Sequence, residues 1–346
     1  MLKTNAKSRY LMIIDTNRVT VSDDNGTLLL DEPLVTKFNR EEEKIYAVGD
    51  DAVNWANNGS GDEKCVIEKP FELGITTSLD ISNSAMEIVN PVERMLTQND
   101  MNFIFRFFIE KALGKCSYKG LRMEAVVPAM FSEEARNMIS EALKYNGLDF
   151  AGFVELPEAI MQNKNIKSGK YNLTVDMGCK VLDISVWSKE GTLSRKEDIL
   201  GLDDLFRDVW DSVYKQCNLR LLGDGEEYVL NNALSGDIKI NELPGDDKYA
   251  GQLDKVKSEI INGEEVYAQM QKYLSNVKDE LTSFMKQQPQ NVLAEIKSNG
   301  LIVTGAVCKL LCFKEMLERQ KETWGIDFSI TAQNAPNEKE WLQISW

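Results

Sequence analysis

The stretch from Tyr171 to Ser188, YNLTVDMGCKVLDISVWS, constrains the fold more than any other part of the chain. Polar and apolar residues alternate at 172–176 and again at 181–187, as is typical of strands, and residues 177–180 predict a tight turn between them. Asp176 ends the first strand and Gly178 lies in the turn. An aspartate so placed can hold a hydrated Mg²⁺ while backbone N–H groups face a phosphate. An ordinary hairpin with an acidic turn fits the same residues, so both interpretations stay open.

Composition excludes several classes of function. The chain has 346 residues, 43% of them hydrophobic, so it can bury the cores of about two domains. Its formal charge of −15 argues against binding to nucleic acid, because a basic stripe is needed to displace counterions from phosphates. The absence of histidine excludes Ser-His-Asp and Cys-His catalysis and every histidine-based metal site.

Cysteine spacing and hydropathy indicate the cellular compartment. The six cysteines form no CxxC pair and no framework typical of secreted proteins, so we expect reduced thiols in a cytoplasmic protein. No stretch approaches the 20 apolar residues of a membrane span, and the first ten residues lack the apolar region of a signal peptide. The mildly basic start of the chain, with Lys3, Lys7 and Arg9, is interpreted as a solvated tail, and a peripheral contact with the inner face of the membrane stays open as an alternative.

The order of expected strands and helices is similar in the two halves of the chain. The first half predicts strands at 10–14, 19–21, 27–37, 45–48, 122–127 and 150–155. It predicts helices around 50–55, from 86 onward, at 101–113 and 132–145, and from Pro157. The second half predicts strands at 172–176, 181–187, 193–199, 300–304 and 326–331, helices at 203–217, 226–234, 266–287, 290–299 and 308–321, and a polar loop at 236–249. Each half begins with a strand that ends in aspartate and leads into a meander. This weak internal duplication suggests two like α/β domains that face a cleft.

Several short motifs, taken in order, carry a resemblance to a known family. Residues 29–35 (LLDEPLV), 127–148 (VPAMFSEEARNMISEALKYNGL) and 154–161 (VELPEAIM) are similar to its third strand, its VP helix and its IEEPMAAA segment. Asp176–Ser188 aligns without gaps to DIGGGTTEVAVIS, and Gly300–Leu317 aligns to GMVLTGGGALLRNLDRLL. Over residues 10–335 the chain thus resembles the actin-like ATPase superfamily, and most of all the MreB bacterial actins. The VP segment is also similar to the large heat-shock chaperones.

The resemblance implies an actin-like α/β fold of two similar domains, each with a mixed five-stranded sheet flanked by helices, around a central cleft. It places the first domain at 1–156, with a small subdomain at about 36–85. The second domain is placed at 157–335, with a small subdomain at about 218–290, and residues 336–346 form a tail. The tail contains Trp341 and Trp346, which dock either on the parent domain or on a partner.

The resemblance further implies ATP and Mg²⁺ as ligands. Asp15 and Asp176 are the expected Mg²⁺ carboxylates, and the expected nucleotide-binding positions are Asp15, Thr16, Asn17, Asp176, Gly178, Lys180, Gly201, Asp203, Glu227 and Gly305. The adenine-side helix of the family carries Glu and Lys three residues apart. Here Glu227 remains, but Leu230 stands at the lysine position.

The three phosphate loops of the family are altered in this chain. The first loop is about four residues shorter, has no glycine and contains Arg18. In the second, Cys179, Lys180 and Val181 replace two glycines and a threonine, so the close backbone approach that glycine permits is lost. The third loop is Thr304-Gly305-Ala306-Val307, in which Val307 projects where a glycine stands in the family. We therefore expect weak nucleotide binding or none, although a cationic side chain could supply some of the missing positive charge.

The catalytic position is also changed. Alignment from Val127-Pro128 places Ala135 where bacterial actins have the glutamate that positions the attacking water. Glu134 is one residue away, which is about 100° around a helix, so it is a candidate only if the alignment slips by one residue.

Three functions remain in competition. The first is an MreB-like cytoskeletal filament or scaffold protein with weakened or absent ATP binding and hydrolysis; head-to-tail stacking of such subunits builds filaments without closure. The second is an active actin-like ATPase that forms filaments. The third is a non-polymerising actin-fold adaptor of a division or pilus machine. A cluster of aromatic residues at 103–108 fits either a helix core or a face for a partner or membrane, and the core interpretation is favoured.

Overall fold

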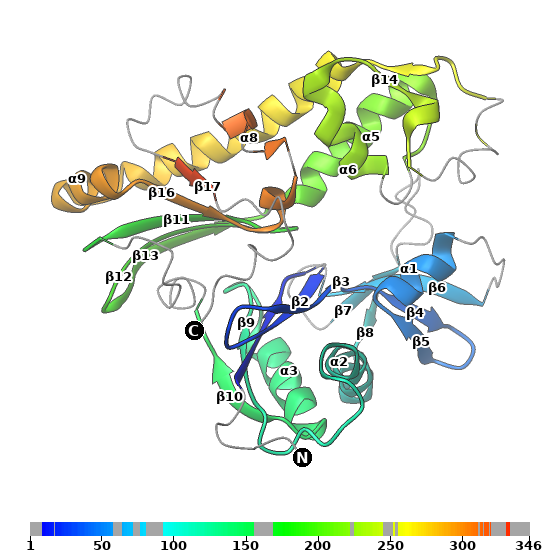
Figure 1. Ribbon diagram of the computed structural model, residues 1–346, viewed down its shortest axis with the longest axis vertical. Coiled ribbons are helices and arrows are strands. Elements are labelled where there is room, and N and C mark those ends of the chain that lie inside the picture. The colour runs from blue at the N-terminus through cyan, green and yellow to red at the C-terminus, as the bar shows by residue number, and fades with distance from the viewer. Residues whose placement is uncertain are drawn as a thin grey trace. The chain divides into compact units, whose positions relative to one another are not determined.

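Two sheets with the same strand order dominate the structure, which is a computed structural model (Figure 1). It describes residues 9–16, 18–57, 64–71, 77–80, 93–155, 169–221, 225–244, 252, 255–310, 312–313, 315–317, 319 and 330–332. The described residues divide into two compact units, one that extends to residue 155 and one that begins at residue 169.

The main sheet of unit 1 has the order β10-β9-β1-β2-β3. Its strands are β1 (Arg9–Ile14), β2 (Arg18–Asp23), β3 (Leu28–Pro33), β9 (Arg122–Val126) and β10 (Asp149–Phe153). The first three strands form an antiparallel meander, whereas β9 and β10 are added in parallel. Helices α2 (Gln98–Leu113) and α3 (Glu133–Tyr145) pack against each other, α2 against β3 and α3 against β10.

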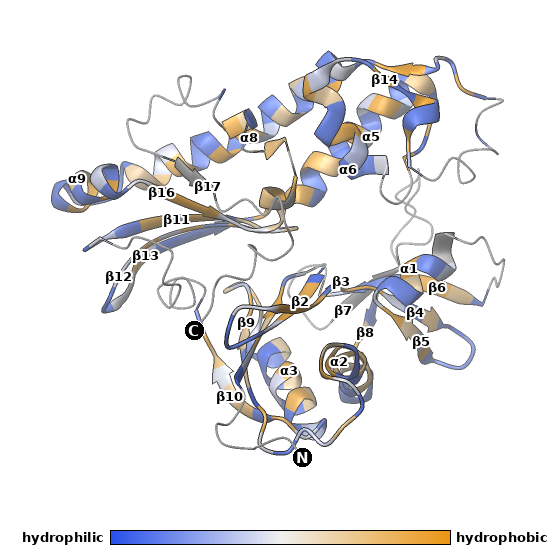
Figure 2. Ribbon diagram, in the orientation of Figure 1, coloured by the Kyte–Doolittle hydropathy of each residue, from blue (hydrophilic) through white to orange (hydrophobic). Residues whose placement is uncertain are grey.

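A second sheet of unit 1, here called the small sheet, has the order β5-β4-β6-β7-β8. Its strands are β4 (Thr36–Asn39), β5 (Lys44–Val48), β6 (Cys65–Pro70), β7 (Thr77–Asp80) and β8 (Glu93–Met95). Helix α1 (Asp50–Asn57) contacts β4, β5 and β6. Figure 2 shows hydrophobic residues along these strands, and several of them join one apolar core with α2 and the main sheet.

The main sheet of unit 2 repeats this topology in the order β13-β12-β11-β16-β17. Its strands are β11 (Asn172–Met177), β12 (Leu182–Ser188), β13 (Gly191–Asp198), β16 (Leu301–Thr304) and β17 (Ile330–Ala332). In both units a three-stranded meander is followed by two parallel strands beside its first strand. The predicted mixed α/β sheets and the duplication of the halves are therefore present.

Helices of unit 2 pack on this sheet and on one another. They are α5 (Leu202–Cys217), α6 (Gly225–Asn232), α8 (Gly263–Met285) and α9 (Gln290–Asn299), with short 3₁₀ helices η1 (Ala233–Ser235), η2 (Ile240–Glu242) and η3 (Ala306–Lys309). Strands β14 (Ile238–Lys239) and β15 (Ile260–Ile261) form a two-stranded ribbon. The long helix α8 contacts α5, α6 and β12, and α9 contacts β11 (Figure 1).

Three expectations about secondary structure were wrong. The helix expected from residue 86 onward contains a strand where it is described, because Glu93–Met95 pairs with β7. The expected loop at 236–249 contains β14 and η2, because Ile238, Ile240 and Leu243 are buried. The helix expected from Cys308 begins later, because η3 and an extended Leu310 come first.

The aromatic cluster on α2 belongs to the core, as predicted. Ile104, Phe105 and Phe108 are fully buried, whereas Phe103 is 40% exposed. Among the described residues, no helix has both the length and the apolar character required to cross a bilayer. The helix expected after Pro157 and the C-terminal tail with Trp341 and Trp346 lie outside the described residues.

Candidate functional site

The turn after β1, the expected first phosphate loop, is closed by its own hydrogen bonds. The N–H of Asp15 donates to the carbonyl of Arg18 at 2.8 Å, and the N–H of Thr16 donates to Asp15 Oδ1 at 2.6 Å. Thr16 is completely buried. The Arg18 side chain pairs with Asp31 on β3, with 2.5 Å between Nε and Oδ1. Asn17 lies outside the described residues. The backbone donors of Asp15 and Thr16 are therefore engaged within the turn.

The hairpin between β11 and β12, the expected second phosphate loop, is closed in the same way. The N–H of Gly178 donates to the carbonyl of Val181 at 2.9 Å. The side chains of Cys179 and Val181 are buried, with 7% and 4% exposed. Lys180 Nζ lies 3.6 Å from Asp203 Oδ2. The residues that replace the family's glycines and threonine thus belong to the packing of the hairpin.

Asp176 at the end of β11 bonds to the neighbouring strand. Asp176 and Thr304 are register partners in β11 and β16, and the Thr304 hydroxyl donates to Asp176 Oδ1 at 2.7 Å. Sequence reasoning placed Thr304 in the third loop but missed this bond, which follows from the parallel pairing of strands 128 residues apart.

The N-terminus of helix α5 is occupied by the hairpin. A helix N-terminus can bind an anion because its first N–H groups have no partner within the helix. Here the N–H of Leu202 donates to the carbonyl of Gly178 at 3.0 Å, and that of Asp203 donates to the carbonyl of Cys179 at 2.9 Å. The N–H of Gly201 donates to the side chain of Asp204 at 3.0 Å. These three donors are consumed by protein acceptors.

Two of the glycines expected to bind nucleotide have a steric reason to be glycine. A Cβ on Gly201 would lie 2.1 Å from the carbonyl oxygen of Cys179. A Cβ on Gly305, whose φ is +101°, would lie 2.3 Å from the carbonyl carbon of Met177. Both contacts are closer than any side chain tolerates, so the hairpin and its neighbours pack backbone to backbone.

A buried tyrosine near these residues was not found from the sequence. Tyr273 on α8 is 3% exposed, and its hydroxyl has no hydrogen-bond partner among the described residues. Burial, followed by the charges of Asp204, Cys308 and Asp176, raises the pKa of Tyr273. Burial and the Asp176 charge likewise raise the pKa of Cys308. No local motif marks Tyr273, because α8 reaches the hairpin only through tertiary packing.

The remaining expected residues stand apart from these turns. Glu134 is exposed on α3, whereas Ala135 is buried in the apolar core. Glu227 is exposed on α6, and Leu230 is buried. Asp15 and Glu134 belong to unit 1, and the residues expected from Asp176 onward belong to unit 2. In the part of the chain that is described, no three His, Cys, Asp or Glu residues are grouped to hold a metal ion.

Six backbone donors in and beside these turns bond to protein acceptors, namely the N–H groups of Asp15, Thr16, Gly178, Gly201, Leu202 and Asp203. A phosphate cradle needs backbone N–H groups directed at its ligand, so these six do not contribute to one in this structure. The acidic residues Asp15 and Asp176 remain at their strand ends, but each already accepts a short bond from a neighbouring residue.

Comparisons with known proteins agree on the ancestry of the chain. The MreB/Mbl protein family matches residues 12–334. No curated protein matches the sequence. MreB5 of Spiroplasma citri, solved with AMPPNP and with ADP, has a TM-score of 0.70 and 13% identity, covering 98% of this chain and 95% of that one. A non-polymerising point mutant of MamK bound to AMPPNP has a TM-score of 0.58 and 11% identity, covering 98% and 97%.

These structural likenesses confirm the predicted actin-like fold. The similarity of the VP segment to heat-shock chaperones stays a prediction. Since the family match extends over nearly the whole of the chain, the protein belongs to the MreB/Mbl family.

Proposed function

We propose that this protein is an actin-like cytoskeletal filament or scaffold protein in which ATP binding and hydrolysis are weakened or absent. It acts in the cytoplasm or at the inner face of the membrane, and its principal partner is a second copy of itself. Family membership and the likeness to MreB5 and MamK support the cytoskeletal part of this proposal. The negative formal charge of the chain fits an absence of nucleic-acid partners.

The main support for weakened or absent nucleotide binding is the hydrogen bonding of the β11–β12 hairpin. The carbonyls of Gly178 and Cys179 accept the first two helical N–H groups of α5, and Gly178 donates to Val181. A phosphate that used the N–H groups of Gly178, Leu202 or Asp203 would have to break these bonds. Assembly can continue without nucleotide, because buried surface alone can drive head-to-tail stacking and hydrolysis is needed only for turnover.

The alternative of an active ATPase is favoured by one observation. Both structural relatives were solved with a nucleotide or its analogue, and Asp176 is kept at the end of β11. In that case Lys180 would supply the charge that the altered turn lacks, and Asp15 and Asp176 would hold Mg²⁺. A non-polymerising adaptor is the third possibility, and it differs from the other two in its state of assembly.

Two measurements on the full chain separate these functions. We expect sedimentation and negative-stain microscopy to show filaments to a similar extent with and without Mg·ATP, and calorimetry to show ATP binding weaker than micromolar. Tight binding with phosphate release would support the ATPase instead, especially if Lys180→Ala weakened it and the exposed control Lys189→Ala did not. A monomer that persists at high protein concentration would support the adaptor.

A further inference from the structure

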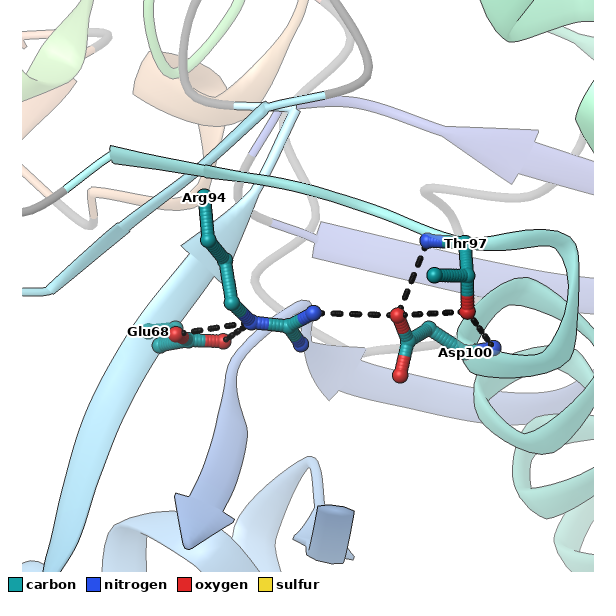
Figure 3. A network of polar contacts seen from close by, with 4 residues as sticks. All are labelled: Glu68, Arg94, Thr97 and Asp100. Atoms are coloured by element: carbon teal, nitrogen blue, oxygen red, sulfur yellow. Dashed lines mark hydrogen bonds and ion pairs between the residues drawn. The ribbon is translucent and has the colours of Figure 1, made fainter. Parts of the chain in front are cut away.

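Arg94 on β8 joins the small sheet of unit 1 to helix α2 (Figure 3). Its Nε lies 3.0 and 2.9 Å from the two carboxylate oxygens of Glu68 on β6. Its Nη1 lies 3.0 Å from Asp100 Oδ2 in the first turn of α2. The Glu68 side chain is only 3% exposed, so this contact is shielded from solvent. One guanidinium therefore bridges a strand of the small sheet and a helix that packs on the main sheet.

The same carboxylate of Asp100 also forms the N-terminal cap of α2. Asp100 Oδ2 accepts from the N–H of Thr97 at 2.8 Å and from its hydroxyl at 2.9 Å, while the N–H of Asp100 donates to that hydroxyl at 3.2 Å (Figure 3). The guanidinium carbon of Arg94 lies 3.8 Å from the ring centroid of Phe38 on β4. Through Arg94 on β8, the start of α2 is thus connected to β6 by Glu68 and to β4 by Phe38.

The other end of α2 carries a second charged tie. Lys111 pairs with Glu32 at the end of β3, and the Glu32 side chain is 5% exposed. Glu32 also accepts from the N–H of Asp50, the first residue of α1, at 3.2 Å. Gly49 has a φ of +65°, and a Cβ there would lie 2.1 Å from Glu32 Oε2. This tie therefore connects α2 through Glu32 to the helix that covers the small sheet.

The apolar contact between the small sheet and α2 does not by itself hold one position. Phe38, Ile45 and Val66 belong to one core with Ile104 and Phe108 of α2. Apolar burial is non-directional, so the burial of these side chains alone does not specify one position of the sheet on the helix. A forked guanidinium between two carboxylates has a narrow geometry, and shielded from water it resists displacement.

We infer that the Arg94–Asp100 pair is a latch that holds the small sheet in one position on α2, so that any movement of this sheet within unit 1 requires the pair to break. The latch belongs to unit 1 alone and does not depend on the proposed function. At the opposite end of the helix, the bond from the Asp50 N–H to Glu32, which Lys111 pairs with, restrains the same movement at a second point.

Hydrogen exchange of the full chain, followed by mass spectrometry, tests the latch. In Arg94→Met we expect exchange to become about tenfold faster in β4, β5 and β6, with the main-sheet strands β1, β2 and β9 unchanged. Arg94→Lys keeps the charge but loses the fork, so it should show a smaller change of the same pattern even if Arg94→Met folds poorly. Faster exchange spread evenly over both sheets, or no change, would overturn the inference.

Three control variants separate the latch from other effects. Thr97→Ala weakens the helix cap but keeps Arg94 beside Asp100, and should leave the small sheet protected. Arg106→Met removes an exposed pair with Glu110 on the same helix and should have no effect. The double variant Glu68→Gln/Arg94→Met also removes the buried Glu68 charge that has lost its guanidinium, yet the small sheet should still exchange fast. If Thr97→Ala reproduced the loosening, or the double variant restored protection, the latch would be refuted.

Discussion

At the scale of single residues, packing explains two of the three glycines expected to bind nucleotide. Gly201 approaches the backbone of Cys179 and Lys180, and Gly305 approaches that of Met177. Each would have to be glycine whether or not a nucleotide binds. By contrast, the two positions at which the resemblance predicts further glycines carry Cys179 and Lys180. Gly201 and Gly305 are therefore required by the fold itself.

Substitution of these glycines should lower stability sharply. Gly201→Ala keeps an ordinary φ of −121° but overlaps the hairpin, so we expect a loss of about 1–3 kcal/mol. Gly305→Ala should lose about 1–3 kcal/mol more of the free energy of unfolding than Gly201→Ala does, because a φ of +101° is strained for alanine. Urea denaturation measures both. Gly147→Ala, with φ of +91° and open space around it, is the control for backbone strain alone.

At the scale of elements, strand β12 differs from its sequence pattern. The alternation at 181–187 predicts two distinct faces, yet all seven residues of β12 are buried. The polar face is satisfied internally: Trp187 Nε1 donates to Thr174 Oγ1 at 2.7 Å, and the Ser185 hydroxyl donates to Asp183 Oδ1 at 2.6 Å. Asp183 also pairs with Arg195 on β13. The alternation of polar and apolar residues alone could not distinguish a polar face exposed to solvent from one covered by partners on neighbouring strands.

Removal of the partner of Asp183 should therefore destabilise the β12–β13 pair. In Arg195→Met the buried Asp183 carboxylate loses its cation, and we expect a loss of about 3–5 kcal/mol in the free energy of unfolding. Lys272→Met removes an exposed pair with Asp208 and should cost about 0–1 kcal/mol. Equal losses in the two variants would show that Asp183 is stabilised by other groups.

At the scale of the whole molecule, the two units share a topology, but the thiols whose pKa is raised by burial lie in unit 2. Burial raises the pKa of Cys308, Cys217 and Tyr273, and raises that of Cys312 to about 12. All four belong to unit 2. In the unfolded chain these thiols lose their protons near a pKa of about 8.5, whereas the folded chain retains them. Their stabilising effect is full below that pH and is lost as pH rises through the folded pKa values.

Unit 2 should therefore weaken in alkali. Between about pH 8.5 and pH 9.5 we expect each deeply buried thiol to contribute a loss of about 1 kcal/mol, measured by hydrogen exchange in β11 and β16 after correction for intrinsic rates. Cys308→Ala should reduce the dependence on pH. Cys116→Ala, at an exposed thiol in unit 1, should not. If the unmodified protein, Cys308→Ala and Cys116→Ala all lost stability equally with rising pH, the effect would not come from Cys308.

Local sequence patterns were enough to predict the strands that end in Asp15 and Asp176, the duplicated α/β halves and the resemblance to bacterial actins. These follow from local periodicity, turn residues and the order of short motifs, all of which are encoded in nearby positions. Tertiary structure alone decided that the N–H groups of α5 bond to the hairpin, that Tyr273 approaches it and that Arg94 joins β6 to α2. Such contacts join residues far apart in the chain, and their geometry depends on how strands and helices pack, which local patterns do not specify.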